Sequence, residues 1–329
     1  MPTVSLTSGK KFTSGEGISI LEASKASNIY LPHSCNTGRC SSCKCKVVSG
    51  VTKELNEESG LTEEEKKDGW ILSCVREAKT DVSIEVEDLG GVSLPAVQTL
   101  PCRISVIEQL SVDVMKVLLR IPATAKLNFI PGQFIEVIGA AGIRRSYSLA
   151  SASDKLLEIH IRSVVGGVMS NYWFNKACVN DLLRLNGPLG TFFLRSCADQ
   201  DLIFLATGTG IAPIKAMLES LVDIPKDKQP KSVFVYWGGR RYKDLYLDLK
   251  EIKFDFSFVP VLSQSDDGWT GDRGYVQHAA IANLSDLTNA CVYACGSNDM
   301  IKSAKTFMIE AGLNSARFYS DAFLCSANN

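Results

Sequence analysis

The sequence has no long hydrophobic run and almost no net charge. No apolar stretch reaches the roughly 18 residues that a membrane-spanning helix needs, and the first twenty residues lack the hydrophobic segment of a signal peptide. The 35 basic and 36 acidic side chains leave a formal net charge of −1, which argues against binding to nucleic acid or to an anionic membrane surface. We therefore expect a cytoplasmic protein that uses no membrane and no nucleic acid.

Histidine is scarce as well, and His33, His160 and His278 are interpreted as structural or surface residues. The sequence contains no internal repeat and no low-complexity segment. Its 329 residues exceed the usual size of one hydrophobic core, while 45% hydrophobic and 22% charged residues are typical of a globular protein. We expect two or three domains, and a monomer.

Cysteine, in contrast, is abundant, with 11 in the chain. Cys35, Cys40 and Cys43 form a C-x4-C-x2-C loop, and Cys74 adds a distant fourth sulfur, which is the spacing of plant-type 2Fe–2S ligands. The alternative is a four-cysteine zinc site, but such sites usually pair their cysteines at both ends, whereas Cys74 stands alone. The spacing predicts a 2Fe–2S cluster, with Gly38 allowing the loop to wrap around it.

The apolar pattern divides the chain into three regions. Residues 1–90 are typical of a small α+β domain. Residues 91–100 are expected to be a linker, because the stretch from Asp88 to Pro101 around them holds two glycines, two prolines and a single charge. Residues 101–198 contain frequent short strands, which predict an antiparallel β-barrel. From residue 199 to 329, apolar strands alternate with helical stretches, which predicts a parallel α/β sheet. The strands expected in the second and third regions span 103–107, 115–121, 133–138, 156–162, 182–185, 202–206, 232–237, 256–262 and 291–295.

Between Lys53 and Asp68, seven acidic side chains accompany three lysines. Thr62 and Glu65 form a capping-box pattern that predicts a helix starting at Glu63. The acidic residues are then either a solvated helix-capping face, since acids favour helix N-termini, or a docking surface for a basic patch on an electron acceptor.

Two motifs in the second region suit a flavin. In the run Arg-Arg-Ser-Tyr-Ser at 144–148, Arg145 can pair with a pyrophosphate, Tyr147 can stack on the flavin, and Ser148 can hydrogen-bond its N5 edge. A glycine-rich run at 166–170 opens an expected helix, whose free N–H groups favour a pyrophosphate. Each motif alone also suits a plain strand or turn, but their order, followed by an expected barrel-closing turn at 187–192, predicts a flavin site. Its expected residues are Arg145, Ser146, Tyr147, Ser148, Gly166, Gly167, Val168, Met169 and Ser170.

A second glycine-rich loop follows the expected strand at 202–206. It consists of Thr207, Gly208, Thr209 and Gly210, and glycines between a strand and a helix let the backbone approach a pyrophosphate. The pattern is not a full G-x-G-x-x-G, so a plain strand–helix turn is the alternative on the residues alone.

The order of these motifs resembles the ferredoxin–NADP reductase superfamily with an attached plant-type ferredoxin domain of the β-grasp type. The resemblance covers nearly the whole chain and implies FAD as the flavin and the 207–210 loop as the nicotinamide site. It also places Arg240, Arg241 and Asp244 where specificity for the adenosine ribose is set. Arginines suit NADPH and an acidic residue suits NADH, so both cofactors stay open, with an inclination to NADH.

The resemblance further implies three catalytic residues, Ser148, Cys295 and Asp321. Cys295, followed by Gly296, would lie beside the nicotinamide C4, with Ser297 where the superfamily usually has proline. Asp321, where glutamate is more common, would hydrogen-bond near Ser148 and Cys295. Phe323 would lie near the flavin face.

Within the superfamily, the segments 122–126, 190–193, 293–297 and 318–323 look closer to CDP-6-deoxy-3,4-glucoseen reductases of dideoxysugar synthesis than to reductases of aromatic-ring oxygenases. Ser41 departs from the glycine that both branches often carry. The expected function is electron transfer from NAD(P)H through FAD and the 2Fe–2S cluster to a partner protein, either a dehydrase or an oxygenase component. A redox-sensing module without turnover is a further alternative.

Overall fold

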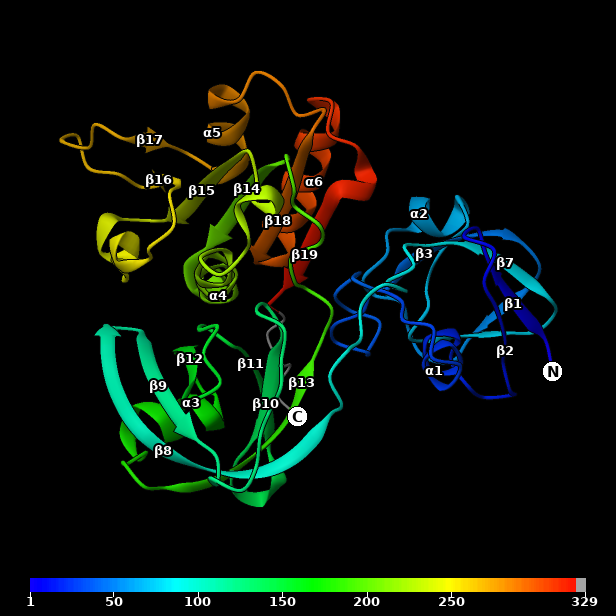
Figure 1. The fold of residues 1–329 in the computed structure, drawn as a ribbon, viewed down its shortest axis with the longest axis horizontal. Coiled ribbons are helices and arrows are strands. Elements are labelled where there is room, and N and C mark those ends of the chain that lie inside the picture. The colour runs from blue at the N-terminus through cyan, green and yellow to red at the C-terminus, as the bar shows by residue number, and fades with distance from the viewer. Residues whose placement is uncertain (324–329) are drawn as a thin grey trace. The chain divides into compact units, whose positions relative to one another are not determined.

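The chain forms two compact units in a computed structural model that describes residues 1–323 (Figure 1). The first unit comprises Met1–Leu94 together with Gly190–Phe192. The second comprises Pro95–Leu189 and the chain from Phe193 onward. No helix in the described part of the chain is long and apolar enough to cross a bilayer.

The first unit is built on a five-stranded sheet with the order β2-β1-β7-β3-β5. β1 and β7 are parallel, and the other neighbours are antiparallel. β4 and β6 form a separate antiparallel pair. This arrangement confirms the expected α+β ferredoxin-like domain. The strands are β1 Thr3–Leu6, β2 Lys11–Thr13, β3 Lys44–Ser49, β4 Thr52–Glu54, β5 Trp70–Leu72, β6 Arg76–Ala78 and β7 Val82–Glu85.

Two short helices complete this unit, α1 Ile20–Ala26 and α2 Glu63–Lys67. Each begins with a full capping box, from Ser19 to Glu22 and, as predicted, from Thr62 to Glu65. α1 buries four residues in the core beneath the sheet, whereas α2 buries none. The acidic first turn of α2 is therefore on the solvent side, which suits a helix-capping face and leaves the docking surface a prediction.

The first half of the second unit is a six-stranded antiparallel sheet with the order β11-β10-β13-β8-β9-β12. A bridge between Leu149 and Ile159 connects its ends, which confirms the expected barrel. The elements are β8 Gln98–Ser111, β9 Val114–Arg120, β10 Phe134–Ile138, β11 Arg144–Ser148, β12 Leu157–Arg162, α3 Val168–Asn175 and β13 Leu182–Leu189.

Two segments of the barrel differ from the sequence-based prediction. β8 starts at Gln98, inside the expected linker, and runs through Pro101. Proline is tolerated there because β8 pairs only with β13 at this point and joins β9 from Arg103 onward. Gly187, expected in a turn, continues β13 instead; a Cβ at this position would lie 2.8 Å from Ile135 Cγ2, so only glycine fits.

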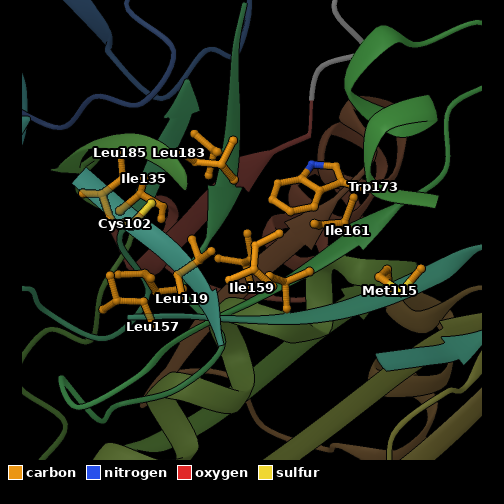
Figure 2. Close-up of a cluster of buried hydrophobic side chains, with 14 of the residues drawn as sticks. Cys102, Met115, Leu119, Ile135, Leu157, Ile159, Ile161, Trp173, Leu183 and Leu185 are labelled. Atoms are coloured by element: carbon orange, nitrogen blue, oxygen red, sulfur yellow. The ribbon is translucent and has the colours of Figure 1, made fainter. Parts of the chain in front are cut away.

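The barrel core contains aliphatic side chains from every strand except β11, together with Trp173 from α3 (Figure 2). Trp173 is 1% exposed, and its indole Nε1 donates a hydrogen bond to Tyr147 Oη at 2.9 Å. The core therefore fixes both α3 and the tyrosine of the predicted flavin motif.

The second half of this unit is a parallel sheet with the order β17-β16-β15-β14-β18-β19. β18 is buried along its entire length, as a strand covered on both faces should be. The expected parallel α/β fold is confirmed, with β17 and β19 adding to the predicted strands. The elements are β14 Asp201–Thr207, α4 Ile211–Leu221, β15 Ser232–Gly239, β16 Ser257–Leu262, β17 Asp272–Arg273, α5 Val276–Asn283, β18 Ala290–Gly296, α6 Asn298–Glu310 and β19 Phe318–Ala322.

A polar network joins the barrel to the parallel sheet. Lys215 on α4 donates to Ala150 O at 3.0 Å and to Glu158 Oε2 at 3.3 Å. His160 on β12 lies between Glu158 and the hydroxyl of Tyr246, with contacts of 2.8 and 3.1 Å. Burial lowers the pKa of His160. His160 is therefore structural, as interpreted from the sequence.

Candidate functional site

The four predicted cluster ligands lie together in the first unit. Cys43 Sγ is 3.1 Å from Cys74 Sγ, and Cys35 N lies 3.4 Å from Cys40 Sγ. All four thiols are free. Four convergent thiols are the donor set that a 2Fe–2S cluster requires, so these residues fit that cofactor.

The loop backbone is shaped around these sulfurs. Gly38 has φ +76°, and a Cβ there would overlap the carbonyl oxygen of Glu57. Thr37 N lies 3.4 Å from Cys35 Sγ. The hydrogen bond from the Cys40 thiol, together with those from Thr37 and from backbone N–H groups, lowers the pKa of Cys35 to about 4, which favours the thiolate form that binds iron.

Ser41 occupies a left-handed conformation, with φ 61°, at the position where the sequence departs from glycine. Its Oγ donates to Gly60 O at 2.6 Å. The left-handed backbone costs a non-glycine residue about 1 kcal/mol or more, and the hydrogen bond contributes about 1 kcal/mol. The two effects nearly cancel.

We therefore expect Ser41→Gly to leave the stability of the cluster domain within about 1 kcal/mol of the wild type, because it removes the strain and the hydrogen bond together. Ser41→Ala keeps the strain and loses the bond, so it should be the less stable variant. Thermal loss of the cluster absorbance measures both. Equal stability of the two variants would contradict this account of Ser41.

The predicted flavin residues of β11 lie beside the barrel core. Tyr147 is held by Trp173, and burial raises the pKa of Tyr147 to about 12. Ser148, at the end of β11, is 6% exposed. Arg144 pairs with Glu136 at 3.1 Å, whereas Arg145 donates to the Arg144 carbonyl. Of these two arginines, Arg144 forms the ion pair with Glu136, and Arg145 does not.

The glycine-rich run opens α3 as predicted. Gly167 is the N-cap and provides no side-chain cap, so the first N–H groups of the helix are available to an anion. Ser170 Oγ accepts from Val164 N at 2.9 Å and closes the loop. The side chain of Met169 packs in the barrel core, so this residue would bind a phosphate through its backbone N–H group. These donors fit the pyrophosphate of FAD.

A cavity of about 850 Å³ lies at the carboxyl ends of β14 and β15. This is where parallel α/β sheets bind ligands. Its lining includes Thr207, Gly208, Arg240, Asp244 and Ser297, which were all named from the sequence. The predicted nucleotide loop forms a short 3₁₀ turn, Gly208–Gly210, directly before α4.

Glycines bring the ends of β14 and β18 into contact beside this cavity. A Cβ at Gly210 would overlap Cys295 O, and a Cβ at Gly296 would overlap Thr207 Oγ1. The two predicted motifs, 207–210 and 295–296, therefore form one cradle of close-packed backbone. Such a cradle fits the dinucleotide of NAD(P)H.

The predicted residues at the C-terminal strand join this cradle. Cys295 on β18 is opposite Asp321 on β19, and both are buried. Burial, followed by the charge of Asp321, raises the pKa of Cys295 well above its usual value. Phe323 N donates to Gly296 O at 2.8 Å. Cys295, Asp321 and Phe323 thus lie at one end of the sheet.

Other cavity residues were missed from the sequence. Arg162, at the end of β12, donates from Nε to Asp113 Oδ2 at 2.8 Å, and both line the cavity. Arg162 lies so close to Gly208 that a Cβ there would overlap Nη1. Tyr275, the exposed N-cap of α5, lines it as well. The sequence did carry a weak signal for both residues, since Arg162 is a basic residue at the end of a strand and Tyr275 is an aromatic residue directly before a helix.

Asp244 also lines the cavity, and its Oδ2 accepts from the backbone N–H groups of Arg240 and Arg241 at 2.9 Å each. His278, interpreted as structural or surface, is exposed and borders the same cavity. The side chain of Arg241, in contrast, is not part of the lining.

Three family models match the chain in succession. They are the 2Fe-2S iron-sulfur cluster binding domain at residues 5–79, the oxidoreductase FAD-binding domain at 101–194 and the oxidoreductase NAD-binding domain at 204–306. They confirm the three expected cofactors.

Similar proteins extend over the full length. A CDP-6-deoxy-L-threo-D-glycero-4-hexulose-3-dehydrase reductase of Yersinia pestis is 40% identical and covers 97% of each chain. A xylene/toluene monooxygenase electron transfer component of Pseudomonas putida is 30% identical over 96% of this chain and 91% of its own. The crystal structure of the Amycolatopsis cytochrome P450 reductase GcoB superposes with a TM-score of 0.74 at 28% identity, covering 98% and 99% of the two chains.

These relatives match nearly the whole length of the chain, and together with the three family models they confirm the resemblance drawn from the sequence. The chain therefore belongs to the ferredoxin–NADP reductase superfamily with an N-terminal plant-type ferredoxin domain, as an oxidoreductase that transfers electrons from NAD(P)H through FAD to a 2Fe–2S cluster.

Proposed function

We propose that this reductase delivers its electrons to the dehydrase of a CDP-deoxysugar pathway. The observation that carries the proposal is the 40% identity, over 97% of both chains, to a reductase named for such a dehydrase. An oxygenase component is the second candidate acceptor, because an electron transfer component of a xylene/toluene monooxygenase is 30% identical.

The acceptor is tested by reconstitution. The purified holoprotein is combined with NADH and either a CDP-sugar dehydrase with its substrate or an aromatic-ring dioxygenase with its substrate. We expect product from the dehydrase at a rate that saturates with reductase concentration. Turnover with the dioxygenase alone would overturn the proposal, whereas steady NADH-dependent reduction of cytochrome c excludes a module without turnover.

We infer the following roles for the cavity residues. Gly208 and Gly210 would let the nucleotide pyrophosphate approach the start of α4, and Arg162 would neutralise part of its charge. Asp113 would orient that guanidinium, as their 2.8 Å contact supports. Cys295 and Asp321 would position the nicotinamide, and Ser148 the flavin edge. FAD, when bound, supplies the conversion of a hydride into single electrons.

We propose NADH as the preferred nucleotide. Asp244 lines the cavity that Arg240 also borders, and its carboxylate would repel a 2′-phosphate while accepting hydrogen bonds from a ribose diol. The inclination from the sequence thus gains support from the placement of Asp244.

Asp244→Asn should raise the kcat/KM ratio of NADPH to NADH by about tenfold, because the amide removes the negative charge yet retains an oxygen for the two backbone N–H groups. Steady-state kinetics with ferricyanide measure the ratio for each nucleotide. Asp267→Asn, in an exposed loop, is the control and should leave it unchanged. An unchanged ratio in Asp244→Asn would show that this carboxylate does not select the nucleotide.

We also propose three domains, at 1–90, 101–198 and 199–329. A linker at 91–100 joins the first two, and its last three residues already belong to β8. The matched models at 5–79, 101–194 and 204–306 support these limits.

We propose a monomer that works in the cytoplasm, where cysteines stay reduced and can bind iron.

A further inference from the structure

One short segment, residues 57–61, contacts both parts of the cluster's ligand set. Toward the three-cysteine loop, Gly60 N donates to Gly38 O at 2.8 Å, and Gly60 O accepts from Ser41 Oγ at 2.6 Å. The same segment therefore fastens the loop between Cys35 and Cys43 from outside.

Toward the fourth ligand, the contact is made by Glu58. Its side chain is fully buried, with 0% exposure. Oε1 accepts from Leu72 N at 2.6 Å, and Oε2 accepts from Arg76 Nη2 at 2.7 Å. Leu72 ends β5 and Arg76 starts β6, so one carboxylate binds the chain two residues before and two residues after Cys74.

The Cys74 turn is bonded to the loop from the other side as well. Ser73 Oγ donates to Cys43 O at 3.1 Å, and Val75 N donates to Leu72 O at 3.0 Å. Position 74 is therefore constrained by both flanking strands. Through its contacts with Leu72 and Arg76, the carboxylate of Glu58 connects this turn to the segment that holds the loop.

The buried ion pair of Glu58 with Arg76 is stable only while both of its charges are present. A buried carboxylate is tolerated only when it is paired and hydrogen-bonded, and removing one partner leaves the other charge uncompensated. Within residues 1–323, the Arg76 Nε atom is buried without a hydrogen-bond partner. Its guanidinium depends on Glu58 and on Glu54, which lies 2.9 Å away but is 48% exposed.

We propose that Glu58 is a positioning residue that holds Cys74 against the three-cysteine loop and, with Arg76, keeps the fourth ligand in a charge-balanced environment. Glu58 is not a ligand itself. Groups behind metal ligands orient them and tune the metal site, and a buried ion pair beside a one-electron centre biases its reduction.

The test uses the full-length holoprotein carrying Glu58→Gln. Iron and acid-labile sulfide per FAD, the EPR spectrum of the reduced protein and a redox titration are the measurements. We expect less cluster per FAD, because glutamine keeps an acceptor for Leu72 N–H but leaves Arg76 unbalanced. The remaining cluster should be easier to reduce by about tenfold, which is about 59 mV for a one-electron couple, since a positive charge favours the reduced form.

Two further variants separate this role from a general loss of stability. Glu58→Gln combined with Arg76→Met removes both charges and should regain cluster content and a potential close to the wild type. Glu54→Gln removes the exposed partner of the same arginine and should change neither. The proposal is wrong if Glu58→Gln matches the wild type in iron content and potential, if Glu54→Gln shifts them equally, or if the double variant is no better than the single one.

Discussion

Replacing Cys40 by serine should abolish onward electron transfer while leaving hydride transfer from NADH intact. Cys40 is 4% exposed and meets Cys35 at the predicted cluster site. A hydroxyl is a harder and far less acidic donor than a thiol, so it is a poor ligand for an iron–sulfur cluster. The broad visible absorbance beyond the flavin bands should vanish, and cytochrome c reduction should fall to background, while ferricyanide, which takes electrons from the flavin, is still reduced.

Cys45→Ser is the matched control. Cys45 lies in β3 with 0% exposure, and burial chiefly raises the pKa of its thiol to about 12, which favours a neutral, inert side chain. The buried hydroxyl should lower stability by about 1–3 kcal/mol but leave the cluster spectrum unchanged. If Cys40→Ser retains that spectrum, or Cys45→Ser loses it, the ligand set is not the one assigned.

Much of the fold was predictable because its signals are local. The capping box of Thr62 and the apolar run of β18 each follow from a few adjacent residues. The start of β8 was not predictable, because Pro101 is acceptable only where β8 lacks its second neighbour. The strand conformation at Gly187 likewise depends on Ile135, which is distant in sequence.

The same distinction applies to the sites. Cys35, Cys40, Cys43 and Cys74 have a spacing that constrains chemistry directly. The pairing of Arg162 with Asp113, however, joins positions 49 residues apart, and neither residue belongs to a motif. Glu58 belongs to the acidic run that the sequence predicts to face solvent, yet it is buried. Its partners are Arg76 and the backbone of Leu72, which lie 18 and 14 residues away. Such partners emerge only when the strands are assembled.

Replacing Gly210 by alanine should lower the kcat/KM for NADH strongly, and this loss should exceed its effects on stability and on FAD and cluster content. The added Cβ would overlap the backbone at Cys295, and backbone cannot yield as a flexible side chain can. The ends of β14 and β18 must then separate beside Cys295, and a displacement of about 1 Å in a reacting group costs roughly 10²-fold in rate. We expect kcat/KM for NADH to fall by about that factor, and stability to fall by about 1–3 kcal/mol through overpacking.

Kinetics with ferricyanide and thermal unfolding measure these two effects. FAD content should stay near one per chain, because the barrel core of Trp173 and Tyr147 is not altered, and cluster content should be unchanged as well. Gly268→Ala is the matched control, since a Cβ at Gly268 meets no atom within 4 Å. Wild-type kinetics in Gly210→Ala would mean that hydride transfer does not depend on the close approach of the 207–210 loop to Cys295, and the cradle could not be the nicotinamide site.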